Sequence, residues 1–179
     1  MKIMGIGLNK TGTTTLKNCM TYWGMRHISC NEITFKLWRN KDFQCLMEIA
    51  SVYDSCEDWP WPLFYQELDL AFAGGKFILT VRLNSNIWYE SLCQHALLTG
   101  PTEYRKHIYG HYMPQGNKQA CIDVYEHHNH SVRQYFKDRP NDFLEVCWEN
   151  GHGWEELSSF LSLPKPDLPF PHANKGKYQ

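Results

Sequence analysis

The chain has 179 residues, of which 42% are hydrophobic and 15% are aromatic, a composition that allows a sizeable core and excludes a disordered protein. Its formal net charge is −1, so no basic field attracts nucleic acid or an anionic membrane, and an anion must be bound by a local site. We expect a single domain over residues 1–179, with no nucleic acid among its partners.

The cysteines and the apolar runs indicate the compartment. There are seven cysteines, an odd number, and no two of them form a C-x-x-C pair, which favours free thiols in a reducing cytosol over disulfides or a zinc site. The first apolar run is short and continues into a glycine loop, so we expect no signal peptide. No run approaches the ~20 apolar residues of a membrane span. The sequence therefore predicts a cytoplasmic protein.

Short apolar runs alternate with amphipathic segments along the chain. Strands are predicted at residues 1–7, 26–29, 76–82 and 141–148. Helices are predicted at residues 13–23, 31–38 with Asn31 as the N-cap, 42–50, 84–98, 117–138 and 153–163, and another begins with Pro62 at its first position. Residues 101–116 are predicted to be irregular, and the tail beyond residue 163 to be extended. This alternation predicts an α/β fold of three layers, α/β/α, around a central, mainly parallel sheet.

The segment MGIGLNKTGTTTL, residues 4–16, has the pattern of a strand end, a glycine loop and a helix start. Gly7 and Gly12 have the spacing of a nucleotide P-loop, but Thr13 stands where that loop has lysine, and Lys10 lies inside the loop. Free amides at a helix start, close-approaching glycines and threonine hydroxyls suit a phosphate or sulfonate. The alternative is a plain strand–turn–helix with a threonine-rich cap.

A magnesium site of the NTPase type has little support in the sequence. Such a site needs an acidic residue after a second strand. The strand at 76–82 ends in Arg82, and the strand at 141–148 reaches Glu149 only beyond Trp148. We therefore expect an anion site that works without a metal.

Four segments resemble one family. GLNKTGTTTL resembles the 5′-phosphosulfate loop of sulfotransferases that use 3′-phosphoadenosine 5′-phosphosulfate (PAPS), proteins with a P-loop-like fold. KFILTVRLNSNIWYESL resembles their second motif, a strand ending in arginine followed by a helix with a serine. DWPWPLFYQELDLAF and GWEELSSFLSLPKPDLPFPHANK are similar to a short subfamily of bacteria and lower eukaryotes. The likeness covers most of the chain except roughly residues 100–140.

The resemblance implies metal-independent, in-line transfer of a sulfuryl group from PAPS to a hydroxyl or amine, leaving 3′,5′-adenosine bisphosphate (PAP). Lys10 would stabilise the bridging oxygen and the departing phosphate. The residues expected to bind the 5′-phosphate are Lys10, Thr11, Gly12, Thr13, Thr14 and Thr15. This function rests on a family resemblance and on the phosphate-binding pattern of the loop. A variant P-loop kinase for a nucleotide or small molecule and a non-catalytic adenosine-phosphate binder therefore stay open as alternatives.

The second motif implies a site for the 3′-phosphate. Arg82 would form a bidentate contact with it, and Ser91 would add a hydroxyl. Lys175, in the tail, would close over the same phosphate. The spacing from Arg82 to Ser91 is one residue longer than the family's, which leaves Ser85 as an alternative. A surface arginine and a frayed tail are the structural alternatives.

The acceptor needs a general base, for which the candidates are Asp58, Glu67 and His27. Asp58 lies in EDWPWP, where Trp59 and Trp61 would line an apolar acceptor pocket and raise the pKa of the aspartate. A turn aspartate, a solvated or ion-paired glutamate and a core histidine are the alternatives. The acceptor is expected to be a small molecule or a glycan, with sugars, phenols, lipid headgroups and peptide tyrosines all open, and the oligomeric state is not indicated.

Overall fold

The computed structural model describes residues 1–171 and is built on a five-stranded sheet with the order β2-β3-β1-β4-β5. The strands are β1 (Ile3–Gly5), β2 (His27–Ile28), β3 (Ser55–Cys56), β4 (Lys76–Thr80) and β5 (Phe143–Val146). Every neighbouring pair is parallel. All five carboxyl ends therefore meet at one edge of the sheet, where ligands bind in such folds.

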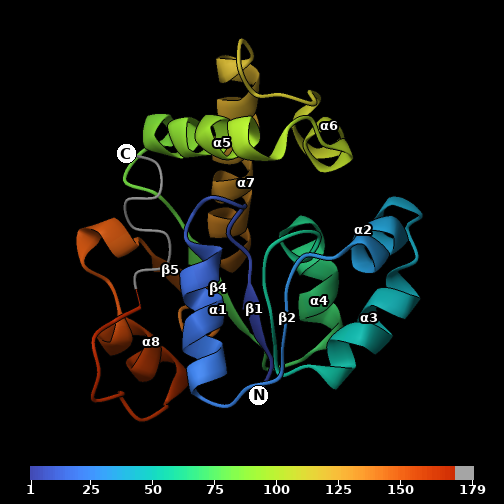
Figure 1. Cartoon of the computed structure of the whole chain (residues 1–179). Helices are drawn as coiled ribbons and strands as arrows, with labels where there is room; N and C mark the ends of the chain where they lie inside the picture. The colour runs from blue at the N-terminus through green and yellow to red at the C-terminus, as the bar shows by residue number, and fades with distance from the viewer. Residues whose placement is uncertain (172–179) are drawn as a thin grey trace.

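Helices lie between successive strands, and one more helix follows the last strand (Figure 1). They are α1 (Thr13–Tyr22), α2 (Glu32–Arg39), α3 (Phe43–Val52), α4 (Tyr65–Ala71), α5 (Ser85–Thr99), α6 (Glu103–Tyr109), α7 (Lys118–Phe136) and α8 (Trp154–Leu161), with 3₁₀ turns η1 (Trp61–Phe64) and η2 (Trp148–Asn150). Asparagine side chains cap two of the starts: Asn31 accepts from the Thr34 amide and Asn84 from the Ile87 amide, both at 3.0 Å. None of the helices in residues 1–171 is long and apolar enough to span a membrane.

The side chains of the strands alternate between two cores, which gives the three predicted layers. On one face, Ile3 and Ile78 pack with α1 and α8. On the other face, Met4, Phe77 and Leu79 pack with α3, α4 and α7. Helices on both faces explain why the residues of the central strand β1 and residues 77–80 of β4 are buried on both sides of the sheet. The predicted three-layer α/β architecture is confirmed.

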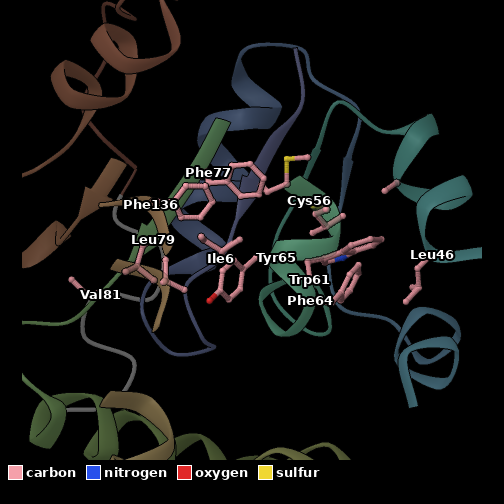
Figure 2. Packing of buried hydrophobic residues seen from close by; sticks show 14 of the residues in the cluster. Ile6, Leu46, Cys56, Trp61, Phe64, Tyr65, Phe77, Leu79, Val81 and Phe136 are labelled. Atoms are coloured by element: carbon pink, nitrogen blue, oxygen red, sulfur yellow. The ribbon is translucent and has the colours of Figure 1, made fainter. Parts of the chain in front are cut away.

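The second of these cores contains large aromatic side chains (Figure 2). Trp61 is fully buried there, 5.7 Å from the Phe64 ring, and Phe77 packs 4.8 Å from Phe136. Burial of each such side chain stabilises the fold by about 1.5–3 kcal/mol. Trp61 therefore belongs to the core, so the expectation that it lines an acceptor pocket is wrong.

A third apolar cluster lies over the carboxyl edge of the sheet. It joins Leu8 of the glycine loop to Trp59, Trp88 of α5, Tyr109 of α6 and Tyr125 of α7. In Figure 1, α5 lies across the top of the sheet, in front of α7 and beside α6. We call α5, α6 and the part of α7 that packs with them the upper layer, which covers the strand ends.

Three elements differ from the predictions. Strand β3 was missed, because only Ser55 and Cys56 pair with β1 and β2, a length too short for a hydrophobic period. Residues 101–116 are not irregular throughout, since they contain α6, whose Thr102 cap accepts from the Arg105 amide at 3.3 Å. Pro62 lies inside η1 rather than at the first position of an α-helix.

Candidate active site

A cleft of about 1130 Å³ opens at the carboxyl edge of the sheet, between the strand ends and α5. Every strand contributes to its walls through the residues that follow it: the glycine loop (residues 7–12) after β1, Cys30 after β2, Asp58 and Trp59 after β3, Val81 and Arg82 after β4, and Trp148 and Glu149 after β5. Because β1 is central, the glycine loop lies in the middle of the cleft, and the residues that follow β3 and β5 line it on opposite sides of the loop. We call these two sides the β3 end and the β5 end.

The glycine loop is fixed from below by β4. A Cβ at Gly7 would overlap both the backbone and the hydroxyl of Thr80, so only glycine fits this position. The Thr11 hydroxyl is fully buried, donates to the Leu8 carbonyl at 2.6 Å and lies 2.6 Å from Thr80 Oγ1. The Thr11 side chain thus shapes the loop, which leaves its backbone as the part that can face a ligand.

The upper layer fixes the same loop through Asn9. The Trp88 indole donates to the Asn9 carbonyl at 2.9 Å, and the Tyr109 hydroxyl donates to Asn9 Oδ1 at 2.6 Å. Trp88 in turn stacks on Tyr125, with 4.4 Å between the ring centroids. Buried hydrogen bonds from two directions hold the loop in one conformation before any ligand binds.

The junction of the loop with α1 is left-handed and uncapped. Gly12 has φ +89°, and in the described chain no side chain caps α1, so the first amides of the helix face outward. A Cβ at Gly12 would overlap the indole of Trp148, which donates to the Gly12 carbonyl at 3.2 Å. Thr13 and Thr15 are buried, whereas Thr14 is exposed, and all three line the cleft.

Lys10 lies in the cleft wall with φ +70°, a conformation that tight anion-binding loops use. Its positive charge acts on two groups of the cleft, because it opposes the rise in the pKa of Asp58 and contributes to the lowered pKa of His95. As part of the loop that follows the central strand β1, Lys10 lies between the β3 and β5 ends of the cleft.

The β5 end of the cleft carries an ion pair. Arg82 donates to Glu149 Oε1 from Nε at 2.8 Å and from Nη2 at 2.5 Å, while its Nη1 donates to the Lys10 carbonyl at 3.1 Å. Burial raises the pKa of Glu149, but the bonds from Arg82 and from the Leu83 amide outweigh it and leave that pKa lowered. Arg82 thus connects the loop to β5, and Glu149 is a partner that sequence reasoning missed.

Helix α5 turns one face to the cleft. Ile87, Ser91, His95 and Thr99 follow one another at four-residue spacing and all line it, as expected for one side of a helix. Ser91 is therefore in the cleft wall, whereas Ser85, at the start of α5, is not among the lining residues. The spacing from Ser91 was the sequence signal that could have indicated His95.

Asp58, at the β3 end, has an unusual carboxyl group. It has φ +62° and accepts from the Trp59 amide at 2.8 Å. Burial, and secondly the charge of Glu57, raise the pKa of Asp58 to about 7, although the Trp59 amide and Lys10 act in the opposite direction. A carboxyl group with this pKa can take up or release a proton near neutrality.

Glu57 and His27 form a buried network behind Asp58. Glu57 Oε1 accepts from the Ser29 hydroxyl at 2.5 Å and lies 3.4 Å from His27 Nε2, and His27 Nδ1 lies 2.7 Å from Ser55 Oγ. A Cβ at Gly5 would come within 2.8 Å of Glu57 Cβ, so β1 leaves room for this glutamate. Both ring nitrogens of His27 face this network, and His27 is not among the lining residues of the cleft.

Glu67 and Lys175 are the remaining predicted residues. Glu67 is exposed on α4 and lines a second cavity, of about 840 Å³, together with residues of α6 and α7. Its carboxylate is therefore not brought together with Lys10 and Asp58. Lys175 lies outside the described residues. Within residues 1–171, no cluster of three or more histidine, cysteine or acidic side chains is arranged to bind a metal.

His95 and Arg105 are two more cleft residues that the sequence analysis did not identify. Burial, and then the charges of Lys10 and Arg105, lower the pKa of His95 to about 4, so its ring is neutral at pH 7. Arg105 is 2% exposed and comes from α6, the helix that was predicted to be irregular chain. Tyr104, next to it, stacks on Trp59 with 5.8 Å between the ring centroids.

The site is that of an α/β protein whose first strand leads into a glycine loop that contains a lysine, with an arginine after β4. Comparison with known proteins agrees with this class. Residues 2–106 and 98–178 match the sulfotransferase domain family, and the chain belongs to this family. The chain is also similar to the Ava biosynthesis cluster protein M of Aspergillus versicolor, with 28% identity over 217 aligned positions that cover 96% of this chain and 80% of that protein.

Proposed function

We propose that the protein transfers a sulfuryl group from PAPS to a hydroxyl or amine of a small-molecule acceptor. The observation that carries the proposal is the placement of Lys10 and Asp58 in one cleft, close enough for the charge of the lysine to act on the carboxyl group. Family membership supports the transferase class, and the rigid loop supports binding of a phosphosulfate.

The chain's own residues fit the donor. The outward amides at the start of α1, with Thr13 and Thr14, would bind the 5′-phosphate, and Arg82 and Ser91 would bind the 3′-phosphate at the β5 end. Arg82 is already engaged with Glu149, so a phosphate would share or replace that partner. Lys10 would neutralise charge that develops on the bridging oxygen. PAPS supplies the sulfuryl group and PAP as its leaving group.

Asp58 is the base that the geometry favours. A base with a pKa near the working pH has both the required deprotonated fraction and the basicity to accept a proton. With a pKa of about 7, Asp58 would take the proton of the acceptor hydroxyl as the oxygen attacks sulfur. His27 and Glu67, the other predicted bases, have no place in this step because neither lines the cleft.

A second candidate function has one observation in its favour. Glu57 and Asp58 follow β3, the strand beside β1, which is where an NTPase carries the acid that serves its magnesium ion. Metal-dependent binding of a nucleoside triphosphate is therefore the rival to test. Against it stands the position of Lys10, three residues before the point where a kinase loop has its lysine.

Calorimetric titration separates the two functions. PAP in EDTA and ATP with Mg²⁺ would be titrated into the wild type and into Lys10→Ala and Arg82→Ala, with Lys17→Ala and Arg39→Ala as controls on exposed positions outside the cleft. We expect metal-free binding of PAP that Arg82→Ala weakens by tenfold or more and the controls leave unchanged. If the protein bound ATP with Mg²⁺ and did not bind PAP, the proposal would be overturned. Binding of PAP without turnover of PAPS across an acceptor panel would indicate a non-catalytic binder.

A further inference from the structure

The β3 end of the cleft contains a buried positive charge that has no negative partner among the described residues. Arg105 is 2% exposed, and its donors go to the Tyr112 carbonyl from Nε at 3.0 Å, to Thr99 Oγ1 from Nη1 at 3.2 Å, and to the Gly100 carbonyl from Nη2. All three acceptors are neutral, and among residues 1–171 no carboxylate forms an ion pair with this guanidinium.

Such an arrangement has a cost that the fold alone does not explain. A buried charge is destabilising unless an opposite charge or a ligand compensates it, and burial lowers the pKa of Arg105 accordingly. The three bonds tie α5 to α6, but the amide group of a glutamine would also donate to carbonyls without bringing a charge. They use three of the five N–H donors of the guanidinium, which leaves capacity for another acceptor.

The position of Arg105 shows where the compensating anion would come from. Arg105 lines the cleft, and its charge acts on His95, which lines the cleft one helical turn from Ser91. On α5, its partner Thr99 lies eight residues beyond Ser91, a distance of about 12 Å along the helix axis. Arg105 is thus remote from the proposed 3′-phosphate site and on the side of the proposed base.

The neighbours of Arg105 at this end are suited to a small planar molecule. Trp59 and Tyr104 are stacked and line the cleft, and the Trp59 indole N–H is buried without a hydrogen-bond partner in the described chain. This N–H is a buried polar group that the described chain leaves unsatisfied. At the same end, the two stacked rings supply a flat apolar wall, and Arg105 supplies a positive charge that an anionic ligand would balance.

We propose that the sulfuryl acceptor carries a carboxylate, which binds Arg105 while the acceptor hydroxyl faces Asp58. This inference rests on the proposed function and names the acceptor class of the same site. A carboxylate carries one negative charge, which one guanidinium balances, and its two oxygens match the planar donor geometry. The acceptor is accordingly a hydroxy acid, and its sulfated product bears two anionic groups.

The test compares two probes of equal shape on PAP-saturated protein, so that the phosphate sites are occupied. 4-Hydroxybenzoate and 4-hydroxybenzamide would be titrated by calorimetry into the wild type, Arg105→Met and the control Arg39→Met, which changes an exposed arginine outside the cleft. We expect the carboxylate to bind the wild type at least tenfold more tightly than the amide. Arg105→Met should lose this preference, and Arg39→Met should keep it.

The outcomes separate this inference from the proposed function. Equal affinity of the wild type for both probes, or no binding of the carboxylate, overturns the carboxylate acceptor even when PAP binds. Failure of PAP to bind without metal overturns the sulfotransferase proposal itself. Arg105→Met can also loosen the contact between α5 and α6. If that variant unfolds, the comparison of the two probes on the wild type decides. Raised salt should then weaken the binding of 4-hydroxybenzoate and leave the binding of 4-hydroxybenzamide unchanged.

Discussion

The two ends of the cleft differ in how their polar groups are paired. At the β5 end, Arg82 is bonded to Glu149 and to the loop backbone, and Trp148 is bonded to Gly12. At the β3 end, Asp58 has a raised pKa and Arg105 has no acidic partner in the described residues. Paired groups keep a fixed geometry, whereas unpaired or perturbed groups are ready to exchange protons or bind charge. Under the proposed function, the donor would bind at the β5 end and the acceptor would react at the β3 end.

The largest effect is expected at Lys10, which lies between the ends. Lys10→Ala should lower the rate at which PAP is formed from PAPS by roughly a thousandfold, because a charge that stabilises the transition state is lost. Kinetics with a panel of phenolic acceptors would measure this, and Lys17→Ala, on the exposed side of α1, is the control. If Lys10→Ala raised KM and left kcat unchanged, Lys10 would contribute to substrate binding alone, and its proposed role in stabilising the transition state would be wrong.

At the β3 end, Asp58→Asn should lower the rate about a hundredfold and remove its pH dependence. In the wild type the rate should rise through pH 7 and level off above it, because the base acts when deprotonated. A wild-type rate that is flat between pH 6 and 8 would exclude Asp58 as the base.

The same residue predicts a change in stability. Between the ordinary pKa of 3.8 and about 7, Asp58 is protonated in the folded protein and ionised in the unfolded protein. The free energy of unfolding therefore falls as pH rises between these values. Thermal unfolding at pH 5 and pH 8 should show that Asp58→Asn loses less stability over this range than the wild type. An equal loss in both proteins would contradict the raised pKa.

A smaller effect is expected from the β5 end. Gly12→Ala forces a Cβ into the Trp148 indole at a residue with positive φ. This should destabilise the fold by roughly 1–3 kcal/mol and lower the affinity for PAP about tenfold. Gly24→Ala is the matched control, because Gly24 also has a positive φ but a Cβ there would meet no atom of residues 1–171 within 4 Å. Equal PAP affinity in both variants would show that the contact with Trp148 does not shape the cradle.

The smallest effect is expected at Glu57, which the structure places behind the base. Glu57→Gln removes a negative charge beside Asp58, so the midpoint of the pH–rate profile should move to lower pH with little change in the maximal rate. Glu67→Gln, outside the cleft, should leave the midpoint in place. A fall in the maximal rate without a shift would assign Glu57 a purely structural role.

Local sequence patterns were sufficient for the α/β architecture and for the loop. Apolar runs and asparagine caps predicted the alternation of strands and helices, and the spacing of Gly7, Lys10 and Gly12 predicted an anion cradle. These features depend on residues close in sequence, whose backbone preferences act locally. The roles of the individual loop residues in binding stay predictions.

Tertiary packing decided the other residues of the cleft. Strand β3 exists because two residues pair with β1 and β2, and only that pairing brings Asp58 to the same edge as Lys10. Arg105 belongs to the cleft because α6 packs over the strand ends. The pKa of Asp58 depends on burial and on Glu57, and no spacing in the chain encodes burial. The sequence alone determined the layers and the glycine loop, and long-range contacts decided which charges face one another.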